Sequence, residues 1–257
     1  MFTSILSSII IWSAVLIIAL RVVTNSGIQF SNNKYISELT CYKGTSSNYE
    51  TTKKDILCVF LLAFSFRIIV FLFSVVIIYM FNDNINSFGD ILEQYMKWDA
   101  NNYVRIATGG YTYYTEGENF TTLAFFPLYP WLMRIVNIIF RDLRVSGLLT
   151  SFALYSGACC FLYKLFSIDY SKSVAVRAII YMSVFPHALF FGVLMNESML
   201  LFTSATTLYY IRKHKWHLVG IWGAAAALSR MLGILLAIPA AVEWLEHYEI
   251  FEKLKNK

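Results

Sequence analysis

The chain has 257 residues, of which 58% are hydrophobic, 17% aromatic and only 14% charged. Such a composition excludes an ordinary soluble domain, and several apolar runs reach the about 20 helical residues that a membrane crossing needs. The net charge of +5 is spread over loops without a basic stripe interleaved with aromatics, which argues against nucleic-acid binding. The sequence therefore predicts an all-α integral membrane protein.

Residues 1–23 form the first apolar run, with Arg21 as its one charge. A leading charged region and a small-residue cleavage site are both missing, so a membrane helix is favoured over a signal peptide. Residues 24–55 are polar and contain several lysines, which favours a cytoplasmic linker. The next span, 56–81, is interrupted by Arg67, a charge that is costly in lipid unless it faces a polar interior or reaches the interface. A structural and a functional role both remain open for it.

The segment 98–130 is the most distinctive part of the chain. It reads WDANNYVRIATGGYTYYTEGENFTTLAFFPLYP, a polar and aromatic loop between apolar runs. Few lysines and arginines occur after Phe81, so this region is expected outside the cell. An acid, Asp99, surrounded by aromatics and followed by a proline-rich turn is a candidate for chemistry. The alternative is an aromatic belt at the membrane interface that happens to contain an acid.

The second half contains further apolar segments of unequal length. The run 123–140 opens with prolines and contains Arg134, which predicts a helix lying in the interface. Full spans are predicted at 145–165, 174–194 and 199–211. One helix over 216–245 would be about 45 Å long with Arg230 at the membrane centre. Two shorter helices, 216–229 and 231–245, are predicted instead.

These segments give seven crossings with the N-terminus outside. Basic clusters at 164–177 and 212–215 then lie in the cytoplasm, with Arg141 and Arg144 as exceptions to the positive-inside rule. The same topology brings three ionisable residues to the outer face: Asp99, Glu197 and Arg230. The four cysteines lack metal-ligand spacing and no acid–histidine cluster is visible, so neither a metal nor a cofactor is expected.

Several motifs carry a resemblance to a known family. The patterns W-D-x-x-x-Y-x-x-I-A-x-x-G-Y and A-F-F-P-x-Y-P in 98–130 are similar to the first extracytoplasmic loop of the PIG-V family. That family comprises the GPI mannosyltransferase II enzymes and their bacterial relatives, within the GT-C class of polyprenyl-phosphate-sugar-dependent glycosyltransferases. Phe185-Pro186, Asn196-Glu197-Ser198 and the AAALSR run at 225–230 also resemble family landmarks. The resemblance covers about 56–245 and corresponds to the N-terminal half of the family only.

The resemblance implies a GT-C-like multi-pass helical bundle with an extracytoplasmic catalytic loop that contains interfacial helices. In this interpretation residues 1–55 are an extra membrane helix with a cytoplasmic linker, 56–245 a partial GT-C-like region, and 246–257 a polar tail. Family members continue with further spans beyond the matching segment. We therefore expect a second polypeptide to complete the fold, or a truncated gene product.

The implied function is transfer of a hexose, by resemblance mannose, from a polyprenyl-phosphate donor to an extracytoplasmic acceptor. The closer similarity to bacterial members favours a bacterial cell membrane, with the endoplasmic reticulum as the alternative. A different class of function also fits the sequence, that of a non-catalytic membrane subunit or a truncated relic of such an enzyme. Asp99 distinguishes the two functions, because only a catalyst requires that carboxylate.

Each candidate site residue has a chemical role and a simpler alternative. Asp99 is the expected base that deprotonates the acceptor hydroxyl, and Arg230 the expected ligand of the donor phosphate. Glu197 is expected either to bind a substrate hydroxyl or to stabilise a helix end. Arg105 either contacts the donor phosphate or balances the acids of the loop. Tyr103 either lines the sugar site or is an ordinary interfacial tyrosine.

Overall fold

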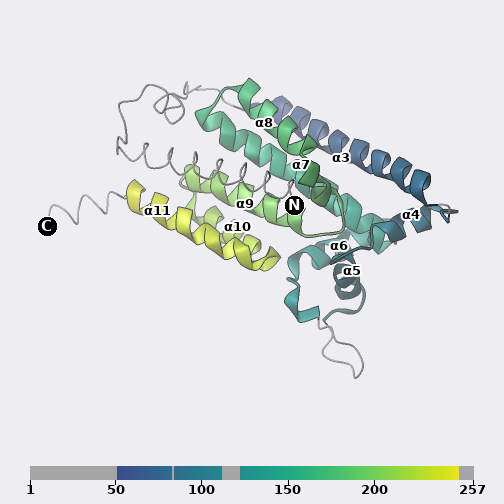
Figure 1. The fold of residues 1–257 in the computed structure, drawn as a ribbon. Helices are drawn as coiled ribbons and strands as arrows, with labels where there is room; N and C mark the ends of the chain where they lie inside the picture. Colours follow the sequence, from purple (N-terminus) through teal and green to yellow (C-terminus); the bar gives the residue numbers. More distant parts are fainter. Residues whose placement is uncertain (1–50, 83, 112–121, 249–257) are drawn as a thin grey trace, which may run out of the picture. The chain divides into compact units, whose positions relative to one another are not determined.

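The computed structural model describes residues 51–82, 84–111 and 122–248. All of them belong to one compact unit, Ser46–Lys257. The predicted first membrane helix at 1–23 and almost all of the polar linker lie outside the described residues. Every regular element in the described ranges is a helix (Figure 1), which confirms the all-α fold class.

The first described helix, α3, runs from Lys53 to Phe81 and confirms the predicted span at 56–81. It begins at a capping box, in which the Thr52 and Asp55 side chains each bond the other residue's backbone N–H. With 29 residues it is longer than a hydrocarbon core requires. Large apolar side chains such as Phe73 and Met80 are exposed on it, as lipid contact demands.

The longest buried helix is α7, Leu143–Asp169, which corresponds to the predicted span at 145–165. It packs against α3, against α8 and against α9, Glu197–Arg212 (Figure 1). Gly157 allows the contact with α9, because an added Cβ there would lie 2.9 Å from the ring of Phe202. This central helix therefore holds the bundle together and fixes the position of α9, which leads to the candidate site.

The predicted span at 174–194 is not one continuous helix. Helix α8 runs from Lys172 to Val184, and the 3₁₀ helix η2 runs from Pro186 to Gly192 at an angle of 84° to it. Pro186 causes the break: it has no N–H to donate, and it restricts Phe185 to an extended conformation with φ −61° and ψ 136°. The residues predicted as the span 174–194 are thus a helix that bends at this proline, and the bend was not predicted.

The predicted interruption at Arg230 is confirmed. Helix α10 runs from Trp216 to Ser229, and Arg230 is extended with φ −159° and ψ 146°. The chain continues as the 3₁₀ helix η3, Met231–Leu236, and then as α11, Ala237–His247. The side chain of Arg230 thus lies at a break between helices, not in the middle of one.

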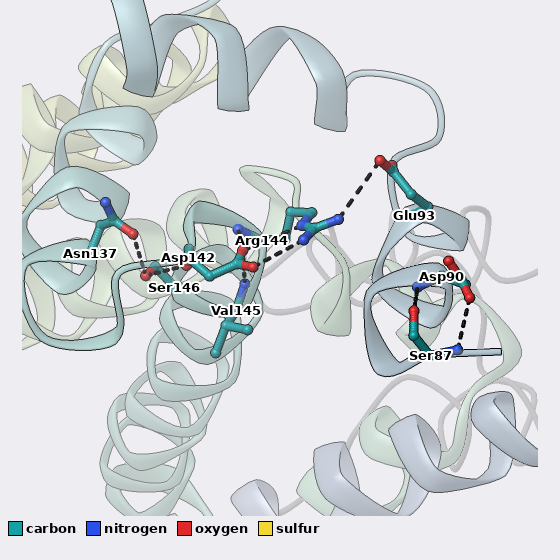
Figure 2. A network of polar contacts seen from close by, with 8 residues as sticks. All are labelled: Ser87, Asp90, Glu93, Asn137, Asp142, Arg144, Val145 and Ser146. Atoms are coloured by element: carbon teal, nitrogen blue, oxygen red, sulfur yellow. Dashed lines mark hydrogen bonds and ion pairs between the residues drawn. The ribbon is translucent and has the colours of Figure 1, made fainter. Parts of the chain in front are cut away.

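The described residues between α3 and α7 form three short α-helices, α4 (Phe88–Gln94), α5 (Ala100–Gly109) and α6 (Leu128–Phe140), and the 3₁₀ helix η1 (Thr122–Ala124). Figure 2 shows the polar contacts that attach α4 to the start of α7. Arg144 lies 3.0 Å from Asp142, the N-cap of α7, and 3.7 Å from Glu93 of α4. Arg144, one of the two exceptions to the predicted charge asymmetry, is therefore tied to two acids.

The seven predicted crossings are only partly testable from helix length. In the described ranges, α3 and α7 are long and apolar enough to cross a membrane, and the bent pair α8–η2 makes a third if it is one span. Helices α6 and α10, with 13 and 14 residues, fall short of the about 20 that a straight crossing needs. The short α6 agrees in length with the predicted interfacial helix. The sidedness and the remaining crossings stay predictions.

Candidate active site

Asp99 is the N-cap residue of α5, but its side chain does not cap the helix. An N-cap aspartate normally accepts a hydrogen bond from the backbone N–H groups of the first turn. Here only the backbone carbonyl of Asp99 accepts such bonds, from Asn102 and Tyr103 at 3.0 and 3.2 Å. The exposed carboxylate has no hydrogen bond or ion pair to any residue in the described part of the chain. It is therefore available to a ligand.

Tyr103 follows one helical turn after Asp99 and is almost completely buried, with 4% of its surface exposed. Its ring makes edge-to-face contacts with Phe125 and Tyr129, at centroid distances of 5.3 and 5.2 Å. Burial raises the pKa of its hydroxyl, and the nearby carboxylates of Glu197 and Asp99 raise it further. The hydroxyl therefore stays protonated and can act as a hydrogen-bond donor.

The second part of the site comes from the N-terminus of α9 and the C-terminus of α10. Arg230 Nη1 donates to Glu197 Oε1 at 3.0 Å, and the Asn196 amide donates to the Ser229 carbonyl at 2.5 Å. These two bonds join the two helix ends, because Asn196 and Glu197 begin α9 whereas Ser229 and Arg230 end α10. The arrangement fixes the Arg230 guanidinium, whose side chain stays 43% exposed.

The turn after Arg230 depends on Gly233. A Cβ at this position would lie 2.2 Å from both the carbonyl carbon and the carbonyl oxygen of Ala226. Only glycine allows η3 to fold back so closely onto α10. The Gly233 N–H also donates to the Arg230 carbonyl at 2.8 Å. Gly233 therefore holds the backbone of Arg230 in place.

Asp99, Tyr103 and Arg230 line one open pocket of about 360 Å³. This volume lies near the lower end of the roughly 300–1,000 Å³ that is typical of small-molecule sites. The rest of the lining is the aromatic and apolar wall of the turn before α6 and of η3, together with one amide: Ala124, Phe125, Phe126, Asn196, Met231 and Leu232. An aspartate, a tyrosine and an arginine thus line a common space with apolar walls.

Two predicted site residues lie apart from this pocket. Glu197 is not part of the lining but pairs with Arg230, and its second oxygen, Oε2, is buried with no hydrogen-bond partner in the described ranges. Arg105 is exposed and is also absent from the lining. Residues two positions apart on a helix point about 200° apart, so Arg105 cannot share the direction of Tyr103.

Two residues that support the site were not identified from the sequence. Arg134 of α6 donates through Nη2 to the carbonyls of Ile106 and Thr108, at 3.1 and 3.4 Å, and through Nε to that of Ala107. It thereby caps the C-terminus of α5, where a cation is favourable. Asn196 was noted only as part of a motif. The position of Arg134 inside an apolar run indicates that it has a buried partner, but the sequence does not say which helix end it caps.

The comparisons with known proteins now bear on this geometry. Residues 126–256, slightly more than half of the chain, match the family model of dolichyl-phosphate-mannose-protein mannosyltransferase. The chain belongs to this family. Neither the curated proteins nor the solved structures contain a match to it.

As a member of this family, the protein is a membrane glycosyltransferase of the GT-C class, which confirms that part of the sequence-based prediction. The matched segment contains Asn196, Glu197 and Arg230 but begins after Asp99 and Tyr103. The narrower resemblance to PIG-V enzymes is not confirmed, because the loop that carries most of it lies outside the match.

Proposed function

We propose that this protein transfers a hexose, mannose by its family, from a polyprenyl-phosphate donor to a hydroxyl acceptor at the extracytoplasmic face of a membrane. The proposal rests on the pocket in which the unpaired carboxylate of Asp99 and the half-exposed guanidinium of Arg230 face the same space. A base and a phosphate ligand are the two groups that this reaction needs.

In the proposed reaction Asp99 takes the proton of the acceptor hydroxyl while the hydroxyl oxygen attacks the anomeric carbon of the donor sugar. The bond from that carbon to the phosphate oxygen breaks, and the products are a glycoside and a polyprenyl phosphate. A single carboxylate on the acceptor side suits inversion at the anomeric carbon. The base must have a free oxygen, which Asp99 has because its side chain does not cap α5.

Arg230 stabilises the negative charge that develops on the leaving phosphate. A guanidinium has five N–H donors, and among the described residues Arg230 uses only Nη1 to bond a protein group, Glu197. The remaining donors can bind two phosphate oxygens side by side. The Tyr103 hydroxyl, which stays protonated, supplies a further donor to the sugar or to the phosphate.

Within the GT-C class we favour a PIG-V-like enzyme of a bacterial cell membrane, on the loop motifs of 98–130. Glu197 is proposed to orient Arg230, and its unused oxygen to accept a sugar hydroxyl. Arg105, on the far side of α5, would contact the donor only outside the pocket. The second polypeptide expected from the sequence stays a prediction.

The experiment that tests the proposal replaces the chain with its Asp99→Asn variant in the source cells. Membranes from these cells receive tritiated polyprenyl-phosphate mannose, and label transferred to endogenous acceptors is measured. The variant keeps the size of the side chain but removes the proton acceptor, so transfer should fall by about 10²–10⁴-fold.

Glu93→Gln is the matched control. Glu93 is another exposed acid of the same region, does not line the pocket, and contacts Arg144 instead. Its neutralisation should leave transfer unchanged. Wild-type transfer by Asp99→Asn, at equal amounts of protein in the membrane, would refute Asp99 as the base and favour a non-catalytic role for this chain.

A further inference from the structure

Arg67 is the most unusual charge in the chain. It lies in the apolar helix α3, only 1% of its surface is exposed, and no acid pairs with it among the described residues. Its guanidinium lies 4.4 Å from the centre of the Tyr155 ring, and its Nε is buried with no hydrogen-bond partner in the part of the chain that the structure describes. A buried cation without a carboxylate is costly, and ionisable residues kept within membrane segments generally serve a function.

The hydrogen bonds of Arg67 go to the two sides of the break between α8 and η2. Its Nη2 donates to the Ser183 carbonyl at 2.7 Å and its Nη1 to the Ala188 carbonyl. Ser183 precedes the 84° bend and Ala188 follows it, and Pro186 between them has no N–H to bond the Ser183 carbonyl. One planar guanidinium therefore holds both arms of the bend and fixes the position of η2.

Helix η2 contacts the Asp99 side of the candidate site through Trp98. The Phe190 ring of η2 packs on the Trp98 ring at a centroid distance of 5.5 Å. Trp98 has a left-handed backbone with φ 51°, a strained conformation for a bulky residue that persists only where neighbours impose it. Trp98 directly precedes Asp99, so its backbone conformation sets the direction of the Asp99 side chain.

Helix η2 is also connected to the Arg230 side of the site, through the residues that directly follow it in the chain. Only Val193, Leu194 and Met195, all buried, separate Gly192 from Asn196 of the pocket. The Ser198 hydroxyl also donates to the Phe191 carbonyl at 2.7 Å, which attaches the start of α9 to η2. The same short helix thus supports Asp99 from one side and the Asn196–Arg230 group from the other.

We propose that Arg67 is a positioning residue for the transfer reaction: by holding η2 at the bend, it sets the distance between Asp99 and the Arg230 side of the pocket. This inference rests on the proposed function of that pocket. Arg67 lies outside the pocket lining and outside the segment that matches the family. It acts on the reaction only through η2.

The first test measures donor kinetics with tritiated polyprenyl-phosphate mannose in membranes that contain Arg67→Lys. Lysine keeps the charge but cannot hold two carbonyls with a planar fork. A misplacement of about 1 Å costs up to roughly 10²-fold, so we expect the apparent kcat to fall about 10- to 100-fold with the donor KM changed less. Arg212→Lys, at the far end of α9, is the control and should behave as wild type.

The second measurement separates positioning from general loss of structure. If Arg67 acts through Phe190 and Trp98, the fold-losses in kcat caused by Arg67→Lys and by Trp98→Ala should not multiply. The double variant should then lose no more kcat than the worse single variant. Multiplied losses would overturn the inference. Should Arg67→Lys fail to reach the membrane, Arg67→Gln takes its place in the same cycle, because glutamine can bond only one of the two carbonyls and leaves no buried charge.

A readout without activity distinguishes failure of this inference from failure of the proposed function. Cysteines at positions 98 and 190, in a chain without Cys41 and Cys58, should be joined in high yield by a short thiol-specific crosslinker. Arg67→Lys should lower that yield severalfold, whatever reaction the pocket performs. Unchanged crosslinking together with reduced kcat would show that Arg67 does not position η2.

Discussion

Charged residues are paired at one end of helices α9 and α10 and partly unpaired at the other. We call the end with Arg212 and Trp216 the paired end, and the end with Glu197 and Arg230 the pocket end. Three contacts between an acid and a base occur at or near the paired end: Asp55 with Lys172, Asp169 with Arg212 at 2.8 Å, and Glu243 with His214 at 3.8 Å. The first two contacts link different helices, and the third links α11 to the turn between α9 and α10, so these contacts join the ends of the bundle.

At the pocket end, charges remain partly unsatisfied. The Asp99 carboxylate has no partner among the described residues, and Glu197 Oε2 is buried without one. Arg230 bonds Glu197 through Nη1, while its side chain stays 43% exposed and lines the pocket. The difference teaches that charge alone does not mark a site: paired charges between helices stabilise the bundle, whereas charges left unpaired around a pocket are kept for a ligand.

The largest response is expected from chemical labelling of the two ends. Lys97, near the pocket end, and Lys213, at the paired end, are both exposed. Each is replaced by cysteine in a chain without Cys41 and Cys58, while the buried Cys159 and Cys160 stay. A membrane-impermeant maleimide applied to intact cells should label position 97 and spare position 213. Equal labelling of both would contradict the proposed sidedness and the extracytoplasmic pocket.

Removal of the pocket cation is expected to have the next largest effect. Arg230→Ala loses the phosphate ligand and leaves Glu197 unpaired, which should cost about 2–5 kcal/mol in kcat/KM for the donor. Arg230→Lys should restore only part of this loss, because lysine cannot bind two oxygens side by side.

Arg212→Ala is the matched change at the paired end. Its partner Asp169 is 49% exposed, so the loss should be about 0–1 kcal/mol of stability, with transfer unaffected. The comparison fails if the two alanine variants transfer mannose equally well.

A smaller effect is expected from the glycine that holds Arg230 in place. Gly233→Ala puts a methyl group against the backbone of Ala226, so η3 must move, at a cost of about 1–3 kcal/mol. The apparent Tm in detergent and the transfer rate should both fall. Gly220→Ala, in the interior of α10 with open space around it, should instead stabilise the protein by about 0.5–1 kcal/mol. A Gly233→Ala variant as stable and active as wild type would show that the close approach is not required.

The sequence by itself determined the membrane class and most helix boundaries. Long apolar runs can only be buried in lipid or in a bundle, so α3 and α7 were predicted from composition. The break at Arg230 was also predictable, since a charge in the middle of a long apolar run is too costly to leave in a straight helix. The bend at Pro186 could have been found by the same local argument, because proline acts on its immediate neighbours.

Only the tertiary structure decided which of these residues meet. Asp99 and Arg230 are 131 positions apart in numbering, and their common pocket depends on how α5, α9 and α10 pack. The sequence left open whether Arg67 faces a polar interior or reaches the interface, whereas the structure buries it against the bend at Pro186 within the chain itself. Arg105 and Tyr103 lie in the same motif, yet the helical period separates their directions, and only Tyr103 lines the pocket. The positions of charges, the helical period and the breaks between helices depend on neighbouring residues and can be predicted from sequence. The partner of each buried polar group is set by packing between distant segments.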